Sequence, residues 1–317
     1  MSKLYATFVI ILLAAAIQAQ TPHSVDSFNK RASGRYARGD YDGAIADFTQ
    51  VIEMTSRPWM RGEQRRNNWA PSPEGGGSAG DRLTVLDPRA ATAYVNRGIA
   101  RLAKEDADGA ISDFDRALTI TPGLVSAYYA RATARLYEGD AGRALADYDK
   151  SVRLDPHFAD GYAGRGDARL AAGDRAGAFA DYERALRLDP HSAGAYSSRG
   201  EARRRTGDAA GAVEDFERAI RLDPHRSEPY CGRGLVRFAA RDLEGAVADF
   251  TKALELDGRL PRAYANRGLA LMLEGKDEEA EKDFSRALTL APGLRGEVEE
   301  AIRAVKASRA TVPLFVP

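Results

Sequence analysis

The stretch GDRAGAFADYERALRLDPH at residues 173–191 returns almost unchanged as GDAAGAVEDFERAIRLDPH at 207–225, 34 residues later. Prolines repeat at the same interval along the chain. They stand at 88, 122, 156, 190, 224 and 292, always a multiple of 34 residues apart, and Gly258 holds the one slot that lacks a proline. A fixed period of this length indicates one supersecondary unit that is repeated and stacked on itself.

Each 34-residue unit has the pattern of two helices. In SAYYARATARLYEG (126–139) and AGRALADYDKSVRL (141–154), apolar and small residues recur at steps of three and four. Gly139-Asp140 separates the two segments, with a glycine for the unusual backbone angles of a turn and an aspartate that can cap the next helix. Pro156 ends the second helix. Helices this short need neighbours, so the units are expected to stack.

Two further marks recur in these units. A group of the form Tyr-x-x-Arg-Gly opens most of them, as in AYVNRGIAR (93–101) and GYAGRGDAR (161–169), and Ala-x-x-Asp-Phe/Tyr-x-x-Ala follows. The 34-residue interval with Gly, Ala, Phe and Pro in these slots resembles the tetratricopeptide repeat family. The resemblance covers a first unit at 24–55 and six contiguous units at 90–293. It implies an all-α, right-handed solenoid of about seven helix pairs, closed by a capping helix at 294–309 and followed by a tail at 310–317.

The first helix departs from the family pattern, because an arginine stands three positions after the tyrosine where a hydrophobic residue is common. An aspartate follows each of these arginines by 16 residues. A ligand-binding ladder of charges is one interpretation. Pairing between the two helices of a unit is favoured, because an unpaired buried charge is costly. The predicted pairs are Arg31–Asp47, Arg97–Asp113, Arg131–Asp147, Arg165–Asp181, Arg199–Asp215, Arg233–Asp249 and Arg267–Asp283.

The N-terminus has the layout of a secretory signal peptide at 1–19. A lysine precedes an apolar run without charge at 4–17, and Ala19 stands at a plausible cleavage point. The alternative is an uncleaved membrane anchor, although a spanning helix needs about 20 apolar residues. We expect an exported protein, periplasmic or secreted, with no stable membrane span after cleavage.

Residues 56–88 interrupt the period. Glycine, proline and serine crowd 71–80, which predicts a flexible insertion. Trp59 and Trp69, the two tryptophans of the chain, lie among Arg57, Arg61, Arg65 and Arg66. They could form a docking loop for an anionic partner or a membrane surface, or simply cover a neighbouring groove.

The sequence offers little for catalysis. His157, His191 and His225 each follow an Asp-Pro pair, but equivalent atoms of stacked units lie about 10 Å apart, too far to share one zinc ion. Cys231 with His225 is the one conceivable nucleophile and base, and a lone helical cysteine is usually a packed residue. We therefore expect no enzyme, cofactor or metal. The alternative is an enzyme with a cryptic site at Cys231.

Charge and resemblance together define the expected partner. The 46 basic and 46 acidic side chains cancel, so the chain lacks the basic surplus of a nucleic-acid binder. In the family the first helix of each unit lines an inner groove, which implies a scaffold that binds a protein or extended peptide. Oligomeric state is left open.

The resemblance places a defined set of residues in that groove. The carboxylates among them favour a partner segment with basic and aromatic side chains, and replacing Asp167 and Glu201 by lysine is expected to abolish binding with little effect on melting. No lysine–asparagine clamp for a terminal carboxylate accompanies Asn96 and Asn266. The predicted groove residues are Asn29, Thr92, Val95, Ser126, Tyr129, Asp160, Asp167, Glu201, Arg204, Glu228 and Arg262.

Overall fold

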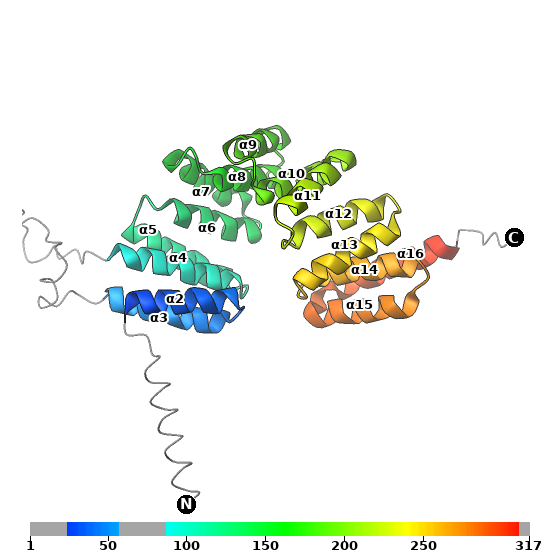
Figure 1. Cartoon of the computed structure of the whole chain (residues 1–317), viewed down its shortest axis with the longest axis horizontal. Helices are drawn as coiled ribbons and strands as arrows, with labels where there is room; N and C mark the ends of the chain where they lie inside the picture. The colour runs from blue at the N-terminus through cyan, green and yellow to red at the C-terminus, as the bar shows by residue number, and fades with distance from the viewer. Residues whose placement is uncertain (1–23, 57–86, 311–317) are drawn as a thin grey trace, which may run out of the picture. The chain divides into compact units, whose positions relative to one another are not determined.

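A computed structural model of the chain describes residues 24–56 and 87–310, with side chains up to residue 307. The predicted signal peptide at 1–19, the tryptophans of the predicted docking loop, Trp59 and Trp69, and residues 311–317 of the tail lie outside the described residues. The described residues begin and end with helices (Figure 1).

The described residues form fifteen α-helices and one 3-10 turn, and they contain no strand. Fourteen of the helices form seven pairs, each made of a first and a second helix, and the last is a single C-terminal helix. In chain order they are α2 (Val25–Ala37), α3 (Tyr41–Ser56), α4 (Pro88–Leu102), α5 (Ala107–Ile120), α6 (Val125–Tyr137), α7 (Ala141–Leu154), α8 (Ala159–Ala171), α9 (Arg175–Leu188), α10 (Ala193–Thr206), α11 (Ala209–Leu222), α12 (Glu228–Ala239), α13 (Leu243–Leu256), α14 (Pro261–Leu273), α15 (Asp277–Leu290), η1 (Pro292–Leu294) and α16 (Arg295–Ala310).

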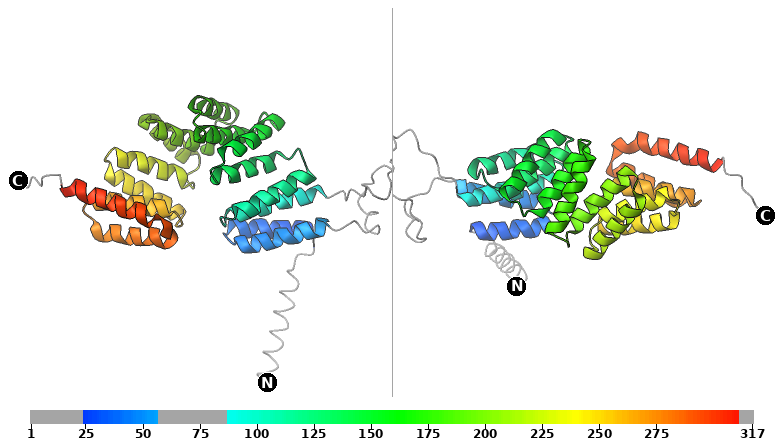
Figure 2. Two further views of the ribbon diagram at one scale, coloured as in Figure 1. Left: turned by 180° about the vertical axis from the view of Figure 1, so that it is seen from behind. Right: turned by 90° about the horizontal axis from the view of Figure 1, so that it is seen from above.

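The chain divides into two units, residues 1–155 and residues 156–317. Unit 1 contains the first three helix pairs, and unit 2 contains the other four with the C-terminal helix. In both units the second helix of one pair packs against the first helix of the next, as α3 does with α4 and α13 with α14 (Figures 1 and 2). The predicted all-α solenoid of seven helix pairs is confirmed.

The recurrent Ala-x-x-Asp-Phe/Tyr-x-x-Ala pattern forms the buried side of each second helix. The first alanine of the pattern is fully buried in all seven pairs, from Ala44 to Ala280. The aromatic residue is at most 6% exposed. These rings are Phe48, Phe114, Tyr148, Tyr182, Phe216, Phe250 and Phe284. Spacings of four and three residues put alanine, aromatic ring and final small residue on one face of the helix.

The glycine of the Tyr-x-x-Arg-Gly group makes room for these rings. A Cβ on Gly98 would lie 2.5 Å from a ring carbon of Phe114, and one on Gly166 would lie 2.6 Å from Tyr182. Such distances are too short for real side chains, so glycine sets how closely the two helices approach. Two pairs carry an alanine at this position, Ala32 and Ala132, and both are fully buried.

The turn between the two helices of a pair has the predicted chemistry. Gly173 has a φ of +86°, a left-handed conformation that glycine adopts without strain. The side chain of Asp174 then accepts a hydrogen bond from the backbone N–H of Gly177 and caps α9. Two pairs use Glu105 and Arg241 at the glycine position, each with a φ of +64°. Residues with a Cβ are strained in the left-handed backbone region, so these two turns are less favourable than the turns that contain glycine.

The capping helix α16 packs on α14 and closes the core of the last pair. Val298 is 6% exposed and contacts a cluster that includes Phe284 and Leu271, while Ile302 and Val305 are partly buried against it. Arg262 of α14 forms an ion pair of 2.9 Å with Glu297 of α16. In the described part of the chain, no helix is both long and apolar enough to cross a bilayer.

Candidate protein-binding face

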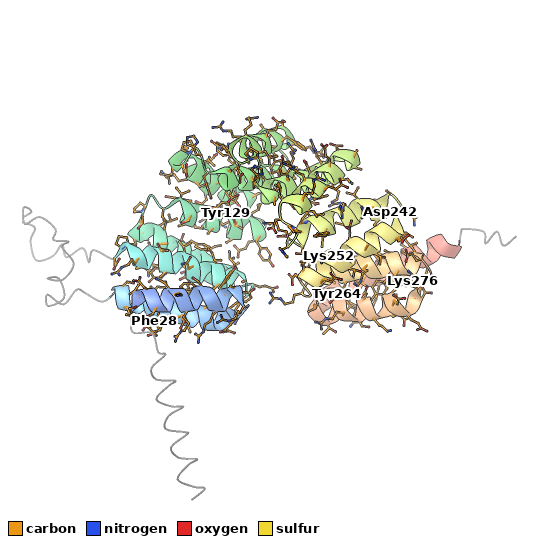
Figure 3. All side chains as sticks on the ribbon, in the orientation of Figure 1. Phe28, Tyr129, Asp242, Lys252, Tyr264 and Lys276 are labelled. Carbon is orange, nitrogen blue, oxygen red and sulfur yellow. The ribbon has the colours of Figure 1, made fainter. Side chains whose placement is uncertain are left out.

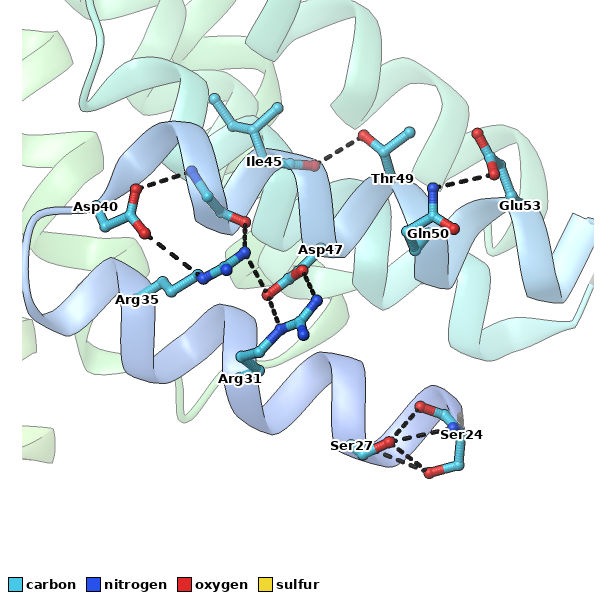
Figure 4. Close-up of polar contacts among 11 residues, drawn as sticks. Ser24, Ser27, Arg31, Arg35, Asp40, Ile45, Asp47, Thr49, Gln50 and Glu53 are labelled. Carbon is cyan, nitrogen blue, oxygen red and sulfur yellow. Dashed lines mark hydrogen bonds and ion pairs between the residues drawn. The ribbon is translucent and has the colours of Figure 1, made fainter. Parts of the chain in front are cut away.

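All seven predicted arginine–aspartate pairs form, and each is bidentate. Figure 4 shows the first of them, Arg31 with Asp47. The arginine Nη2 lies 2.5–2.7 Å from the aspartate Oδ1, and its Nε lies 2.7–3.0 Å from Oδ2. The carboxylates are only 2–7% exposed. This geometry joins the two helices of each pair, which confirms the predicted pairing.

A second arginine, which sequence reasoning missed, approaches the same carboxylate in six pairs. It stands one helical turn after the first, and its Nη1 lies 2.6–3.0 Å from Oδ2 of the aspartate. These residues are Arg35, Arg101, Arg135, Arg169, Arg203 and Arg237. In the seventh pair, buried Leu271 takes this place. The signal was present in the sequence as an arginine twelve residues before each of the first six aspartates.

The first arginine also stacks on an aromatic ring of its own helix. In every pair its Cζ lies 5.1–5.9 Å from the centroid of the ring three residues earlier, from Phe28 in the first pair to Tyr264 in the last (Figure 3). Ring, guanidinium and carboxylate thus form one contact across each helix pair. Each of these arginines therefore stabilises its own helix pair through an internal ion pair. It does so at the position where a hydrophobic residue is common in the family pattern.

The predicted groove residues lie on the first helices, and most of them reach solvent. Within each of the two units, we call this side of the first helices the first-helix face. Five of the predicted residues are exposed, namely Thr92, Ser126, Asp160, Glu228 and Arg262. Five others are half-buried, namely Asn29, Tyr129, Asp167, Glu201 and Arg204. Tyr129 lies on α6 and makes an edge-on contact with Tyr148 at 5.7 Å (Figure 3).

The prediction for Val95 is wrong. Its side chain is 4% exposed and packs in a cluster with Phe114 and Ala130. The adjacent pair α6–α7 follows α4–α5 closely enough for α4 to contact α6. Val95 therefore stabilises the core between two pairs and is not available to a ligand.

Three of the four predicted carboxylates of the groove have partners within the chain, whereas Asp160 is exposed. Glu201 accepts hydrogen bonds of 2.8 and 2.7 Å from Arg204 and forms an ion pair of 3.1 Å with Arg205. Glu228 is paired with Arg226 at 3.1 Å. Asp167 accepts hydrogen bonds from Tyr182 and Ser198. The expectation that lysines at Asp167 and Glu201 leave melting unchanged is therefore corrected, because both changes remove internal contacts.

Exposed apolar side chains are an independent feature of the face. Among the described residues, the large hydrophobic side chains that are more than about one third exposed all belong to unit 1: Tyr36, Met54, Ile99, Tyr137 and Leu154. Three of them, Tyr36, Ile99 and Tyr137, lie on the first helices α2, α4 and α6. Each stands seven or eight residues after Asn29, Thr92 or Tyr129, a spacing that places it on the same side of its helix. Tyr137 is 72% exposed.

Cys231 does not have the properties of an activated nucleophile. It is half-buried on α12, and burial raises the pKa of its thiol to about 11, with Glu228 adding to the effect. A catalytic cysteine needs a lowered pKa. In residues 24–56 and 87–310, no three His, Cys, Asp or Glu side chains gather closely enough to hold a metal ion.

Comparison with protein families gives a clear result. Models described as tetratricopeptide repeat match residues 79–125, 129–193, 164–227 and 261–294, which together exceed half of the chain. No curated protein matches the chain.

Solved structures with the same fold cover between 57% and 90% of this chain. A tetratricopeptide repeat protein from Parabacteroides merdae is 16% identical, with a TM-score of 0.58 over 90% of this chain and 100% of that one. The tetratricopeptide repeat protein TTC0263 from Thermus thermophilus is 23% identical, with a TM-score of 0.54 over 57% of this chain and 99% of that one. The Cut9–Hcn1 assembly contains a chain that is 16% identical, with a TM-score of 0.61 over 88% of this chain and 55% of that one. At these identities the likeness concerns the fold alone.

Proposed function

Because the chain belongs to the tetratricopeptide repeat family, we propose that it is a non-catalytic scaffold that binds an extended protein segment on its first-helix face. Repeats of this kind form protein-interaction scaffolds, and helix pairs make up nearly all of the described residues. The alternative, an enzyme with Cys231 as nucleophile, has less support because the pKa of the thiol is raised.

The chemistry of unit 1 indicates what kind of segment it binds. Along α4 and α6, the solvent-facing stripe carries Thr92, Ile99, Ser126, Tyr129 and Tyr137, none of which is charged. Exposed aromatic and aliphatic side chains that cluster on one face are typical of interaction sites. A segment with apolar or aromatic side chains and few charges fits this face better than the basic segment expected from the sequence, because Glu201 and Glu228 are already paired with arginines and Asp167 already accepts two hydrogen bonds.

A peptide library tests the proposal. Wild-type protein is expected to select uncharged segments with aromatic or aliphatic residues. The double variant Ile99→Asp with Tyr137→Asp should bind them roughly tenfold less tightly or worse, because each aspartate would be desolvated against an apolar side chain. Both positions are exposed, so the fold should tolerate the change.

A matched control is available in the same unit. Met54 and Leu154 are 37% and 39% exposed and lie on the second helices α3 and α7. Met54→Asp with Leu154→Asp adds the same charge away from the first-helix face and should leave binding unchanged. Equal losses in the two double variants, or a library without selected sequences, would contradict the proposal.

We also propose that this binding takes place outside the cytoplasm, on the basis of the apolar run at 4–17 and the small residues that follow it. Protein recovered from the envelope or medium of the cells that produce it should then begin at Gln20. An intact Met1 in the membrane fraction would favour an uncleaved anchor.

A further inference from the structure

Asp167 differs from the seven aspartates of the arginine pairs. Its Oδ1 accepts a hydrogen bond of 2.8 Å from the Tyr182 hydroxyl, and its Oδ2 accepts one of 3.1 Å from the Ser198 hydroxyl. Among the described residues, no arginine or lysine forms an ion pair with it, whereas each pair aspartate has one or two arginines in direct contact. A carboxylate held only by hydroxyl groups gains less from being charged than one held by a cation.

The contacts of Asp167 join three helices of two successive pairs. Asp167 lies on α8, Tyr182 on α9 and Ser198 on α10, so one carboxyl group links the fourth helix pair to the fifth. The third pair contains a neutral counterpart. There Thr133 Oγ1 lies 2.9 Å from Tyr148 Oη, with the same fifteen-residue separation. Five of the seven pairs place a phenylalanine, which has no hydroxyl, at the position of Tyr182.

The charged groups around Asp167 do not compensate for its burial. On α9 the facing titratable group is Tyr182, which is itself close enough to Asp181 to feel its charge. On α10 they are Glu201, which repels the carboxylate, and Arg205, which attracts it but is paired with Glu201. Burial raises the pKa of Asp167 from its ordinary 3.8 to about 6, although the hydrogen bonds from Tyr182 and Ser198 lower it.

We infer that Asp167 is a pH-responsive tether between the fourth and fifth helix pairs. When protonated, its carboxyl group can donate one hydrogen bond and accept another, so both hydroxyl contacts are kept without a charge between the packed helices. When ionised, it places an unpaired charge between α8, α9 and α10, which weakens their packing. The tether is closed near pH 5 and loosened near pH 8. This inference does not depend on the proposed function.

The direction of the pH effect follows from proton binding. The pKa of Asp167 is higher in the folded chain than in the unfolded chain, so at intermediate pH the folded chain binds this proton more tightly. The contribution of Asp167 to the free energy of unfolding therefore falls as the pH rises through about 6. The difference of about two pH units corresponds to a proton affinity roughly 100-fold higher in the folded chain. Acid therefore stabilises the packing around Asp167, which is the opposite of the usual behaviour of carboxylates.

Two variants and one matched control test the inference. The carboxyl carbon of Asp167, observed by NMR and assigned from its loss in Asp167→Asn, should titrate near pH 6. Tyr182→Phe should raise that pKa by roughly half a unit or more, because it removes a donor to the ionised form. The fold should tolerate phenylalanine, since five pairs already carry it.

Thermal melting and amide hydrogen exchange test the inference a second time. Asp167→Asn should melt at roughly the wild-type temperature near pH 4 and about 3–6 °C above it at pH 8. Amide exchange in α8 and α10 should slow in this variant at pH 8. Thr133→Val, which removes the neutral counterpart, should change stability equally at both pH values. A carboxyl that titrates near pH 4, or one that Tyr182→Phe does not shift, would overturn the inference.

Discussion

Replacing Asp215 by alanine is expected to lower the free energy of unfolding by about 3–5 kcal/mol, because it leaves the partly buried Arg199 without its counterion and Arg203 with only a longer contact of 3.6 Å to Asp208. Asp215 is 2% exposed and pairs with both Arg199 and Arg203. A guanidinium group is not deprotonated in a protein, so the arginine left behind cannot lose its charge to relieve the defect. Urea unfolding followed by helical circular dichroism measures the loss.

The chain itself contains a control for this prediction. Arg203→Leu removes the second arginine and reproduces the last helix pair, in which Leu271 is buried at the equivalent position. We expect a cost of about 1 kcal/mol or less, since Asp215 keeps its bidentate partner. Arg199→Met should lie between the two. A loss below about 1 kcal/mol for Asp215→Ala would contradict a structural role for the pairs.

The same variants also test whether the arginine–aspartate pairs serve stability or ligand binding. The arginine pairs lie between helices of one pair, and their carboxylates are almost fully buried. Variants that remain folded should therefore bind a peptide with unchanged affinity. If Arg199→Met lost affinity at unchanged stability, the charged ladder would be a binding element after all.

The sequence predicted the fold well because the period, the turn residues and the buried pattern all repeat. The spacing of 16 residues between Arg165 and Asp181 was enough to predict their pairing, since it is constant in seven units. The second arginine was not predicted, because the contact depends on how closely the two helices approach. Arg169 stands twelve residues before Asp181 and reaches its carboxylate across the helix pair.

The binding face was harder to predict, because exposure depends on neighbouring pairs and not on the pattern within one pair. Val95 and Ile99 are four residues apart on α4, yet the first is buried against Phe114 and the second is 36% exposed. Asp167 and Glu201 occupy equivalent positions on α8 and α10. One meets a tyrosine hydroxyl and the other meets arginines, which the repeat pattern alone does not distinguish.

The second large effect is expected where a ring joins two helix pairs. The Phe216 ring of α11 is 1% exposed and lies against Gly200 of α10 and Gly232 of α12. A Cβ on Gly232 would lie 2.3 Å from the Phe216 ring. Phe216→Ala should cost about 3–5 kcal/mol through the cavity that it leaves between the fifth and sixth pairs.

A double-mutant cycle shows whether the ring and the glycine depend on each other. Gly232→Leu alone should cost roughly 2–3 kcal/mol, because the new side chain overlaps the Phe216 ring. In the Phe216→Ala background the same leucine can occupy the space that the ring has left. The double variant should therefore be more stable than the sum of the two changes predicts, by about 1 kcal/mol or more. Urea unfolding of the four proteins measures this coupling. Strictly additive losses would mean that Gly232 is required by the backbone of α12 and not by the ring packed against it.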